Sequence, residues 1–248
     1  MKDTRRLYSD LSWIWPIVSP PEDYIEETEF FSRIIKEDAK IDVRSLLHMG
    51  CGGGRNDFTF KKHFDVTGVD ISDDMLRLAR ELNPESVYIQ GDMRSIRSDK
   101  TYDSIVALDS VNYMKTEEDL IDLFQTAYEH LNPGGVFLTV VEESRRRFKQ
   151  NRTISSTHSR DDTQITFIEN SFDPDPADNH FEMTFIYLVR EKGNLEIFTD
   201  SHIWGLFKME TWHQLLKKAN FSVQELKFAH STFLEDKFLP MFVCLKPQ

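Results

Sequence analysis

The feature that most constrains the fold is a regular alternation of short apolar runs and helical patterns between residues 45 and 141. The apolar runs have the length and composition of buried strands, and the segments between them show helical periodicity. Strands that alternate with helices imply right-handed crossovers, and therefore a parallel, doubly wound sheet. The expected strands are 45–49, 64–69, 87–90, 104–108 and 136–141, and the expected helices are 57–62, 73–82 and 117–130.

A glycine-rich loop follows the first of these strands. Gly50, Gly52, Gly53 and Gly54 come directly after the apolar run, and such crowding usually brings the backbone close to a ligand. The glycines fit G-x-G-x-G, whereas Arg55 occupies the third glycine position of the dinucleotide pattern G-x-G-x-x-G. This mismatch makes a nicotinamide-dependent oxidoreductase a less favoured interpretation of the glycine loop.

The pattern changes after Val141. Residues 142–160 are polar and contain a basic cluster from Arg145 to Lys149, and three runs of strand character follow. Turn sequences join these runs, so we expect an antiparallel meander inserted into the α/β domain, as a lid or substrate platform. The expected meander strands are 164–172, 180–190 and 195–207, and the elements after them are a helix over 210–219 and strands over 222–228 and 241–245.

An aromatic stretch precedes the first strand. Tyr8, Trp13 and Trp15 lie among prolines that interrupt regular structure, which predicts a packed arm. After Pro20-Pro21, apolar residues recur at helical spacing and predict an amphipathic helix of about three turns.

Charge and cysteine content exclude several classes of partner. The formal net charge is −12, which disfavours nucleic acid and anionic membranes. No stretch approaches the ~20 apolar residues that a membrane span needs. Cys51 and Cys244 lie far apart and show neither metal-ligand nor redox spacing. We expect a cytoplasmic protein in a reducing compartment, without a metal centre, a nucleic-acid partner or a membrane partner.

Four ordered motifs resemble those of class I S-adenosylmethionine-dependent methyltransferases. They are the glycine loop, Val69-Asp70-Ile71-Ser72, Gln90-Gly91-Asp92-Met93-Arg94 and the segment 102–110. The resemblance implies a seven-stranded Rossmann-like sheet and S-adenosylmethionine as the cofactor. It also implies that Asp70 accepts hydrogen bonds from both ribose hydroxyls, that Asp92 binds the adenine amino group and that Met93 covers the ring. The residues it assigns to the cofactor are His48, Gly50, Cys51, Gly52, Gly54, Asp70, Ile71, Met75, Asp92, Met93, Leu108 and Asp109.

His48 departs from the family pattern. The family's first motif usually opens with Asp or Glu, which lies near the amino acid part of the cofactor. An imidazole can also accept or donate a hydrogen bond, so we expect cofactor binding to be retained, with affinity that is weaker or more sensitive to pH as one outcome. A non-catalytic cofactor-binding or regulatory protein on the same fold is therefore the alternative.

The arm, the meander and its exit over 199–207 resemble the subgroup that contains N,N-dimethyltransferases of amino sugars. This resemblance implies methyl transfer to a small molecule, with nitrogen favoured over oxygen. The expected domains are an arm with its helix over 1–40, a methyltransferase domain over 41–141 and 208–248, and the inserted platform over 142–207.

Methyl transfer depends mainly on orientation, which supplies roughly 7–11 kcal/mol of a barrier in favourable cases. An amine acceptor that arrives as ammonium must also lose a proton, and Tyr113 and His202 are the candidate groups for this step. Simple packing is the alternative for both. The sequence leaves open the acceptor, the number of methyl groups transferred and the oligomeric state, a homodimer included. The candidate substrate contacts are Tyr8, Trp13, Trp15, Tyr24, Tyr113 and His202.

Overall fold

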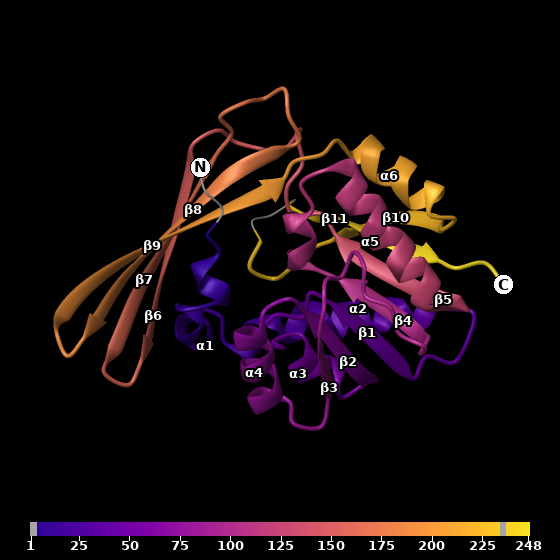
Figure 1. Cartoon of the computed structure of the whole chain (residues 1–248), viewed down its shortest axis with the longest axis horizontal. Coiled ribbons are helices and arrows are strands. Elements are labelled where there is room, and N and C mark those ends of the chain that lie inside the picture. Colours follow the sequence, from indigo (N-terminus) through magenta and orange to yellow (C-terminus); the bar gives the residue numbers. More distant parts are fainter. Residues whose placement is uncertain (1–3, 234–236) are drawn as a thin grey trace.

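A computed structural model describes residues 4–233 and 237–248. Its centre is a seven-stranded sheet with the strand order β10-β11-β5-β4-β1-β2-β3, in which β11 alone runs antiparallel to both neighbours. A second, antiparallel sheet has the order β6-β7-β8-β9 and extends away from the first (Figure 1). The predicted α/β class, with a mostly parallel sheet and an inserted meander, is confirmed. The strands of the central sheet are β1 (Ser45–Met49), β2 (Asp65–Asp70), β3 (Val87–Gln90), β4 (Tyr102–Ala107), β5 (Leu131–Val140), β10 (Ser222–Phe228) and β11 (Leu239–Leu245).

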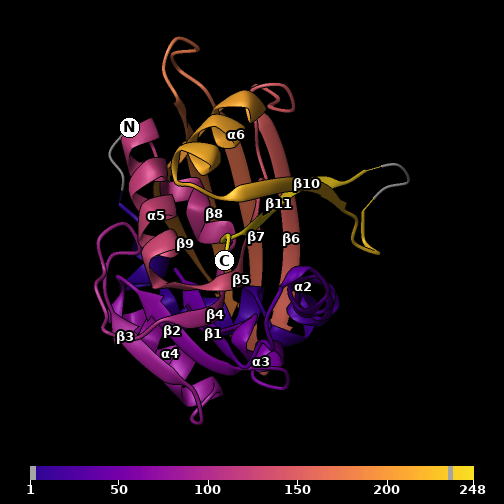
Figure 2. The same cartoon turned by 90° about the vertical axis from the view of Figure 1, so that its right-hand side faces the viewer.

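Helices cover both faces of the central sheet (Figure 2). On one face, α2 (Ile25–Asp38) and α3 (Asp57–Phe60) bury aromatic and branched side chains such as Phe31 and Ile35. On the other face, α5 (Glu117–His130) and α6 (Met209–Lys218) pack through residues that include Phe124 and Trp212, whose rings lie 5.8 Å apart. The helix α4 (Asp73–Leu82) packs beside β2 and β3. Both faces of the sheet are therefore buried, as parallel strands require.

Side-chain caps fix the starts of two helices, α4 and α5. The Ser72 hydroxyl accepts a hydrogen bond from the Met75 backbone N–H at 3.1 Å, and this fixes the start of α4. Thr116 and Asp119 form a reciprocal capping box at the start of α5. Ser72 lies two residues after the end of β2 and Thr116 nine residues after the end of β4, so the caps also set where the chain turns back across the sheet.

The meander has four strands, where the sequence predicted three. The additional strand, β6 (Arg152–Arg160), is almost wholly exposed and, among the described strands, pairs with β7 (Thr163–Phe172) alone. An edge strand with both faces near solvent carries little hydrophobic alternation, so its sequence looked like a polar connection. The other two strands are β8 (His180–Glu191) and β9 (Asn194–Gly205).

Two local predictions are also wrong. The strand predicted over 136–141 begins earlier, at Leu131, and its pairing with β4 shifts register between Tyr102 and Ser104. The helix predicted over 57–62 ends at Phe60, because a series of turns continues to residue 63.

The N-terminal arm lies between the two sheets (Figure 1). It consists of the short helices η1 (Arg6–Tyr8), η2 (Ser12–Ile14), α1 (Trp15–Val18) and η3 (Pro21–Tyr24). Apolar residues of the arm, such as Leu7 and Ile14, pack against the inner face of the meander around Phe185 and Tyr187.

Within the described residues, no helix is long and apolar enough to cross a membrane. Residues 1–3 of the expected arm and residues 234–236 of the expected methyltransferase domain lie outside the described residues.

Candidate active site

A cavity of about 210 Å³ lies at the carboxyl ends of β1, β2 and β4, beneath the arm. β1 and β4 are neighbours from which the strand order proceeds in opposite directions, and such switch points are where open α/β sheets bind ligands. Gly50 has φ +72°, and a Cβ there would approach the Ser110 Oγ to 2.1 Å. Gly52 has φ +52° and open space around its missing side chain. The glycine loop therefore needs glycine for its turn at both positions, and for close packing at Gly50.

Fourteen of the predicted site residues line this cavity, and four do not. Gly54 faces Asn83 and Tyr88 instead, and Met75 is buried in α4. Trp13 is 43% exposed and packs on Phe198 of the meander. His202 lies behind the cavity wall. The fourteen lining residues are Tyr8, Trp15, Tyr24, His48, Gly50, Cys51, Gly52, Asp70, Ile71, Asp92, Met93, Leu108, Asp109 and Tyr113.

Asp70 lies at the end of β2, where backbone donors hold both of its carboxylate oxygens. Gly52 N–H donates to Oδ2 at 2.8 Å, and Ser72 N–H donates to Oδ1 at 2.9 Å. Burial raises the pKa of Asp70, and the two backbone hydrogen bonds oppose that rise. Each oxygen keeps a further lone pair, so the carboxylate can accept two hydroxyl groups from a ligand.

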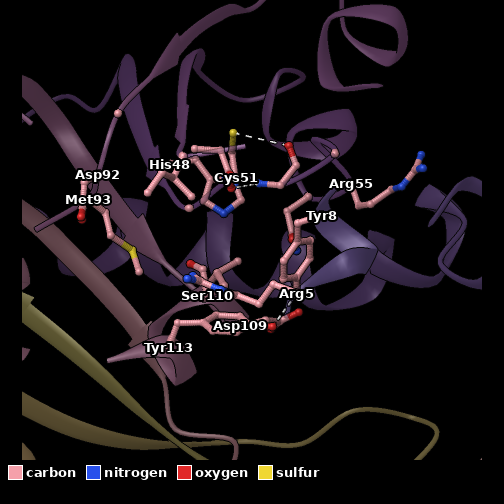
Figure 3. A pocket seen from close by; sticks show the side chains of 18 of the residues that line it. Arg5, Tyr8, His48, Cys51, Arg55, Asp92, Met93, Asp109, Ser110 and Tyr113 are labelled. Atoms are coloured by element: carbon pink, nitrogen blue, oxygen red, sulfur yellow. Dashed lines mark hydrogen bonds between the residues drawn. The ribbon is translucent and has the colours of Figure 1, made fainter. Parts of the chain in front are cut away.

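Asp92 and Met93 lie at one side of the cavity and Arg55 at the other (Figure 3). Arg94 donates to the Asp92 carboxylate, at 2.6 Å from Nη2, and also bonds Asp119 of α5. These hydrogen bonds hold the pKa of Asp92 below its usual range. Asp92 is thus fixed as an acceptor beside the apolar side chain of Met93.

His48 closes the end of β1 and is buried against a second carboxylate. Its Nδ1 lies 2.7 Å from Oδ1 of Asp57, whose other oxygen accepts a hydrogen bond from the Tyr88 hydroxyl at 3.0 Å. Asp57 is fully buried at the start of α3. A buried carboxylate from the following helix thus lies beside His48, the residue at the position of the family's usual strand acid.

A second buried chain of polar groups connects the cavity to the meander. The Tyr113 hydroxyl lies 2.6 Å from His202 Nδ1, and it donates to the Tyr8 hydroxyl at 2.9 Å. His202 Nε2 lies 2.8 Å from Oδ2 of Asp200, which is buried in β9. Burial would raise the pKa of Asp200, but hydrogen bonds from His202 and Thr4 outweigh it and hold that pKa well below its usual range. Asp200 therefore stays ionised behind the imidazole.

Three carboxyl groups gather at the end of the cavity near β5. Burial, with the neighbouring charge of Asp109, raises the pKa of Glu27 to about 8. Burial and Asp109 also raise the pKa of Glu142 well above its usual range. Glu142 further lines a second cavity of about 190 Å³, which Phe181 and Trp204 of the meander bound on the other side. Asp109 and Glu142 thus stand between the two cavities.

Sequence reasoning missed several residues of this site. Asp57 and Asp200 were not singled out, because each acts on a histidine that only the folded chain brings near. Arg55 was read solely as a mismatch in a glycine pattern, yet its buried side chain lines the cavity. An acid close after the unusual His48 is the one signal that could have pointed to Asp57.

Comparisons with known proteins agree with this geometry. Residues 46–135 match the model of a family described as a methyltransferase domain. A putative methyltransferase of Bacillus subtilis, YqeM, is 28% identical over 89% of this chain and 88% of its own length. A Streptomyces venezuelae dTDP-3-amino-3,4,6-trideoxy-alpha-D-glucopyranose N,N-dimethyltransferase is also 28% identical, over 83% of this chain and 86% of its own. The crystal structure of Streptomyces venezuelae DesVI superposes with a TM-score of 0.83 at 25% identity and covers 100% of both chains.

The sheet order and the motif residues around one cavity define a methyltransferase of the class I fold. The chain is an S-adenosylmethionine-dependent methyltransferase, with a methyltransferase domain over residues 46–135, and it is similar to amino-sugar N,N-dimethyltransferases.

Proposed function

We propose that this enzyme transfers a methyl group from S-adenosylmethionine to the nitrogen of a small-molecule acceptor. The observation that carries the proposal is the convergence of the glycine loop, Asp70, and Asp92 with Met93 on a single cavity. Support for nitrogen comes from the activity in the name of the Streptomyces venezuelae relative.

The residues of the cavity fit this cofactor. Open space over Gly52 gives the backbone direct access to a ligand, and Asp70 has acceptor capacity for a ribose diol. Asp92 and Met93 provide an acceptor and an apolar surface for adenine, and Cys51, Ile71, Leu108 and Asp109 complete the wall. When bound, S-adenosylmethionine supplies a methyl group on a sulfonium, which a nucleophile displaces.

The chain's own contribution is to exclude water and to position the acceptor. Tyr8, Trp15 and Tyr24 close the cavity from the arm, and each lies beside the glycine loop or Asp109 in the lining. We assign the acceptor to the second cavity, next to Glu142, with the meander as its platform. Tyr113, backed by His202 and Asp200, is placed to relay the proton of an acceptor ammonium: its oxygen would take that proton while its own hydroxyl proton, turned from Tyr8 to His202, passes to Nδ1. The Nε2 proton of His202 stays hydrogen-bonded to the ionised Asp200. These roles correspond to a methyltransferase domain over 41–141 and 208–248 and a platform over 142–207.

Calorimetric titration with S-adenosylhomocysteine tests the cofactor, and a methylation assay tests the acceptor. We expect binding that falls at least ~10-fold in Asp70→Asn, since a hydrogen bond to a charged group contributes roughly 1.5–3 kcal/mol. Asp74→Asn, an exposed acid in α4, is the control and should bind normally.

The acceptor probe is dTDP-3-amino-3,4,6-trideoxy-α-D-glucopyranose, compared with its 3-hydroxy counterpart and a panel of simple amines and alcohols. Methylation of alcohols only would contradict the preference for nitrogen. Tight binding of NAD(H), without binding of S-adenosylhomocysteine, would overturn the proposal as a whole.

A further inference from the structure

The pair formed by His48 and Asp57 has a geometry that suggests a specific ligand group. Asp57 can only accept hydrogen bonds when it is ionised, so the imidazole donates its Nδ1 proton to Oδ1 at 2.7 Å. This bond fixes both the ring orientation and the position of that proton, as second-shell carboxylates do for histidines elsewhere. Nε2 is then the atom that remains for a ligand.

The pair is rigidly supported from three elements. Tyr88 of β3 donates to the second oxygen of Asp57 at 3.0 Å, and Asn83 donates to the Tyr88 hydroxyl at 3.0 Å and to the Gly54 carbonyl at 2.9 Å. Burial and the charge of Asp57 raise the pKa of Tyr88, so its hydroxyl stays a donor. Asp57 and Asn83 are completely buried. The network therefore holds the glycine loop and the imidazole in one fixed arrangement.

The described part of the chain offers no hydrogen-bond partner to the cavity side of the imidazole. Among residues 4–233 and 237–248, none hydrogen-bonds Nε2, although His48 lines the cavity next to Gly50. The carboxyl groups of Asp70 and Asp109 line the same cavity, which favours a cationic group there.

We propose that His48 binds the ammonium group of the cofactor's methionine part through Nε2, and that Asp57 is the positioning residue that makes this nitrogen an acceptor. An ammonium has three N–H donors and no acceptor, so it matches a nitrogen lone pair and not a second N–H. The inference rests on the proposed function, because S-adenosylmethionine or S-adenosylhomocysteine must be the ligand. In this arrangement the imidazole of His48 and the carboxylate of Asp57 together take the place of the family's strand carboxylate.

The test compares three ligands by calorimetry. They are S-adenosylhomocysteine, the analogue without the amino group (4-(adenosylthio)butanoate), and the analogue without the carboxylate (3-(adenosylthio)propylamine). For the wild-type protein we expect removal of the amino group to weaken binding ~10- to 100-fold, the range of a hydrogen bond to a charged group. In His48→Leu the loss should vanish, while the penalty for removing the carboxylate stays unchanged.

Asp57→Asn separates positioning from packing, because its amide keeps the shape of the carboxylate but can donate to Nδ1. We expect this variant to lose most of the difference in affinity between S-adenosylhomocysteine and the analogue without the amino group. We also expect ¹⁵N NMR of histidine to show a changed ring tautomer. In the wild-type complex, the same spectrum should show Nδ1 protonated and Nε2 as an acceptor. His63→Leu is the matched control, since His63 forms an exposed pair with Glu29 at 2.8 Å away from the cavity.

Three outcomes would overturn the inference. The first is a His48→Leu variant that still binds the analogue without the amino group more weakly than S-adenosylhomocysteine. The others are a wild-type affinity that depends on the carboxylate but not on the amino group, and a protonated Nε2 in the wild-type complex. Because the ligand series and the spectrum of the wild-type protein need no substitution, poor folding of a variant leaves the inference decidable. Wild-type protein that binds none of the three ligands would instead refute the proposed function, and this inference with it.

Discussion

Replacing Glu27 by Gln should stabilise the protein at neutral and alkaline pH. Glu27 lies in α2, where its side chain accepts a hydrogen bond from Asn56 at 2.8 Å and stands near Asp109. Burial and that neighbouring charge raise its pKa from 4.5 to about 8. In the folded protein Glu27 therefore holds a proton that the unfolded chain has already released.

The sign and size of the effect follow from this difference. Between pH 4.5 and about 8 the folded state binds more protons, so its stability falls as the pH rises, by up to ~1.4 kcal/mol per pH unit. Over the whole interval the unfolding free energy falls by about 3–5 kcal/mol. This range extends below the value that the pKa difference of Glu27 alone would give, because part of that difference comes from its interaction with Asp109. Gln keeps an oxygen for Asn56 and carries no charge, so Glu27→Gln removes the pH-dependent loss.

Urea unfolding of both proteins from pH 5.5 to 8.5 measures the difference. We expect Glu27→Gln to gain stability over wild type steadily as the pH rises, with little further change above pH 8. Glu37→Gln, an exposed acid of the same helix, should show no such trend. A difference that stays flat across this range would show that Glu27 ionises normally, and the reasoning from burial would be wrong.

Three further substitutions test other parts of the structure. Gly50→Ala should lower the affinity for S-adenosylhomocysteine at least ~10-fold by calorimetry, because the new Cβ would lie 2.1 Å from Ser110 Oγ, whereas Gly193→Ala meets no atom within 4 Å and should bind normally. Equal loss in both would assign the effect to backbone strain. Thr116→Ala should cost ~1 kcal/mol in urea unfolding by removing the capping box of α5, and no change would show that the cap is dispensable. Phe124→Ala, which empties a completely buried position, should cost about 3–5 kcal/mol, and a loss under ~1 kcal/mol would mean that the core refills the cavity.

The sequence predicted the central sheet well because each of its strands has a recognisable local pattern of apolar residues. Apolar runs with helical segments between them, and caps such as Ser72, locate β1 to β5 without knowledge of the partners. β6 gave no such signal, since an exposed edge strand is defined by its pairing with β7 and not by its own hydrophobicity. The sequence analysis missed β6 because an exposed edge strand forms through long-range pairing, which leaves no local pattern in its own sequence.

The same difference between local and long-range signals separates the site residues that the sequence could place from those that it could not. Residues that follow a strand end, such as Asp70 and Asp92, could be placed at the cavity by order alone, because parallel strands bring their carboxyl ends to one edge. The partners of the two histidines could not be placed this way. Asp57 approaches His48 through the return of the glycine loop, and Asp200 reaches the cavity wall only because the meander folds back over it.

The attachment of the N-terminal arm has a consequence for the order in which the protein is made. Thr4 and the Leu7 backbone N–H both bond Asp200, across sequence separations of 196 and 193 residues. The arm leaves the ribosome first, yet its docking site in β9 emerges only after about four-fifths of the chain has been synthesised. Contacts of such range form late in folding. The cavity that Tyr8 closes is therefore completed last, by the segment that was synthesised first.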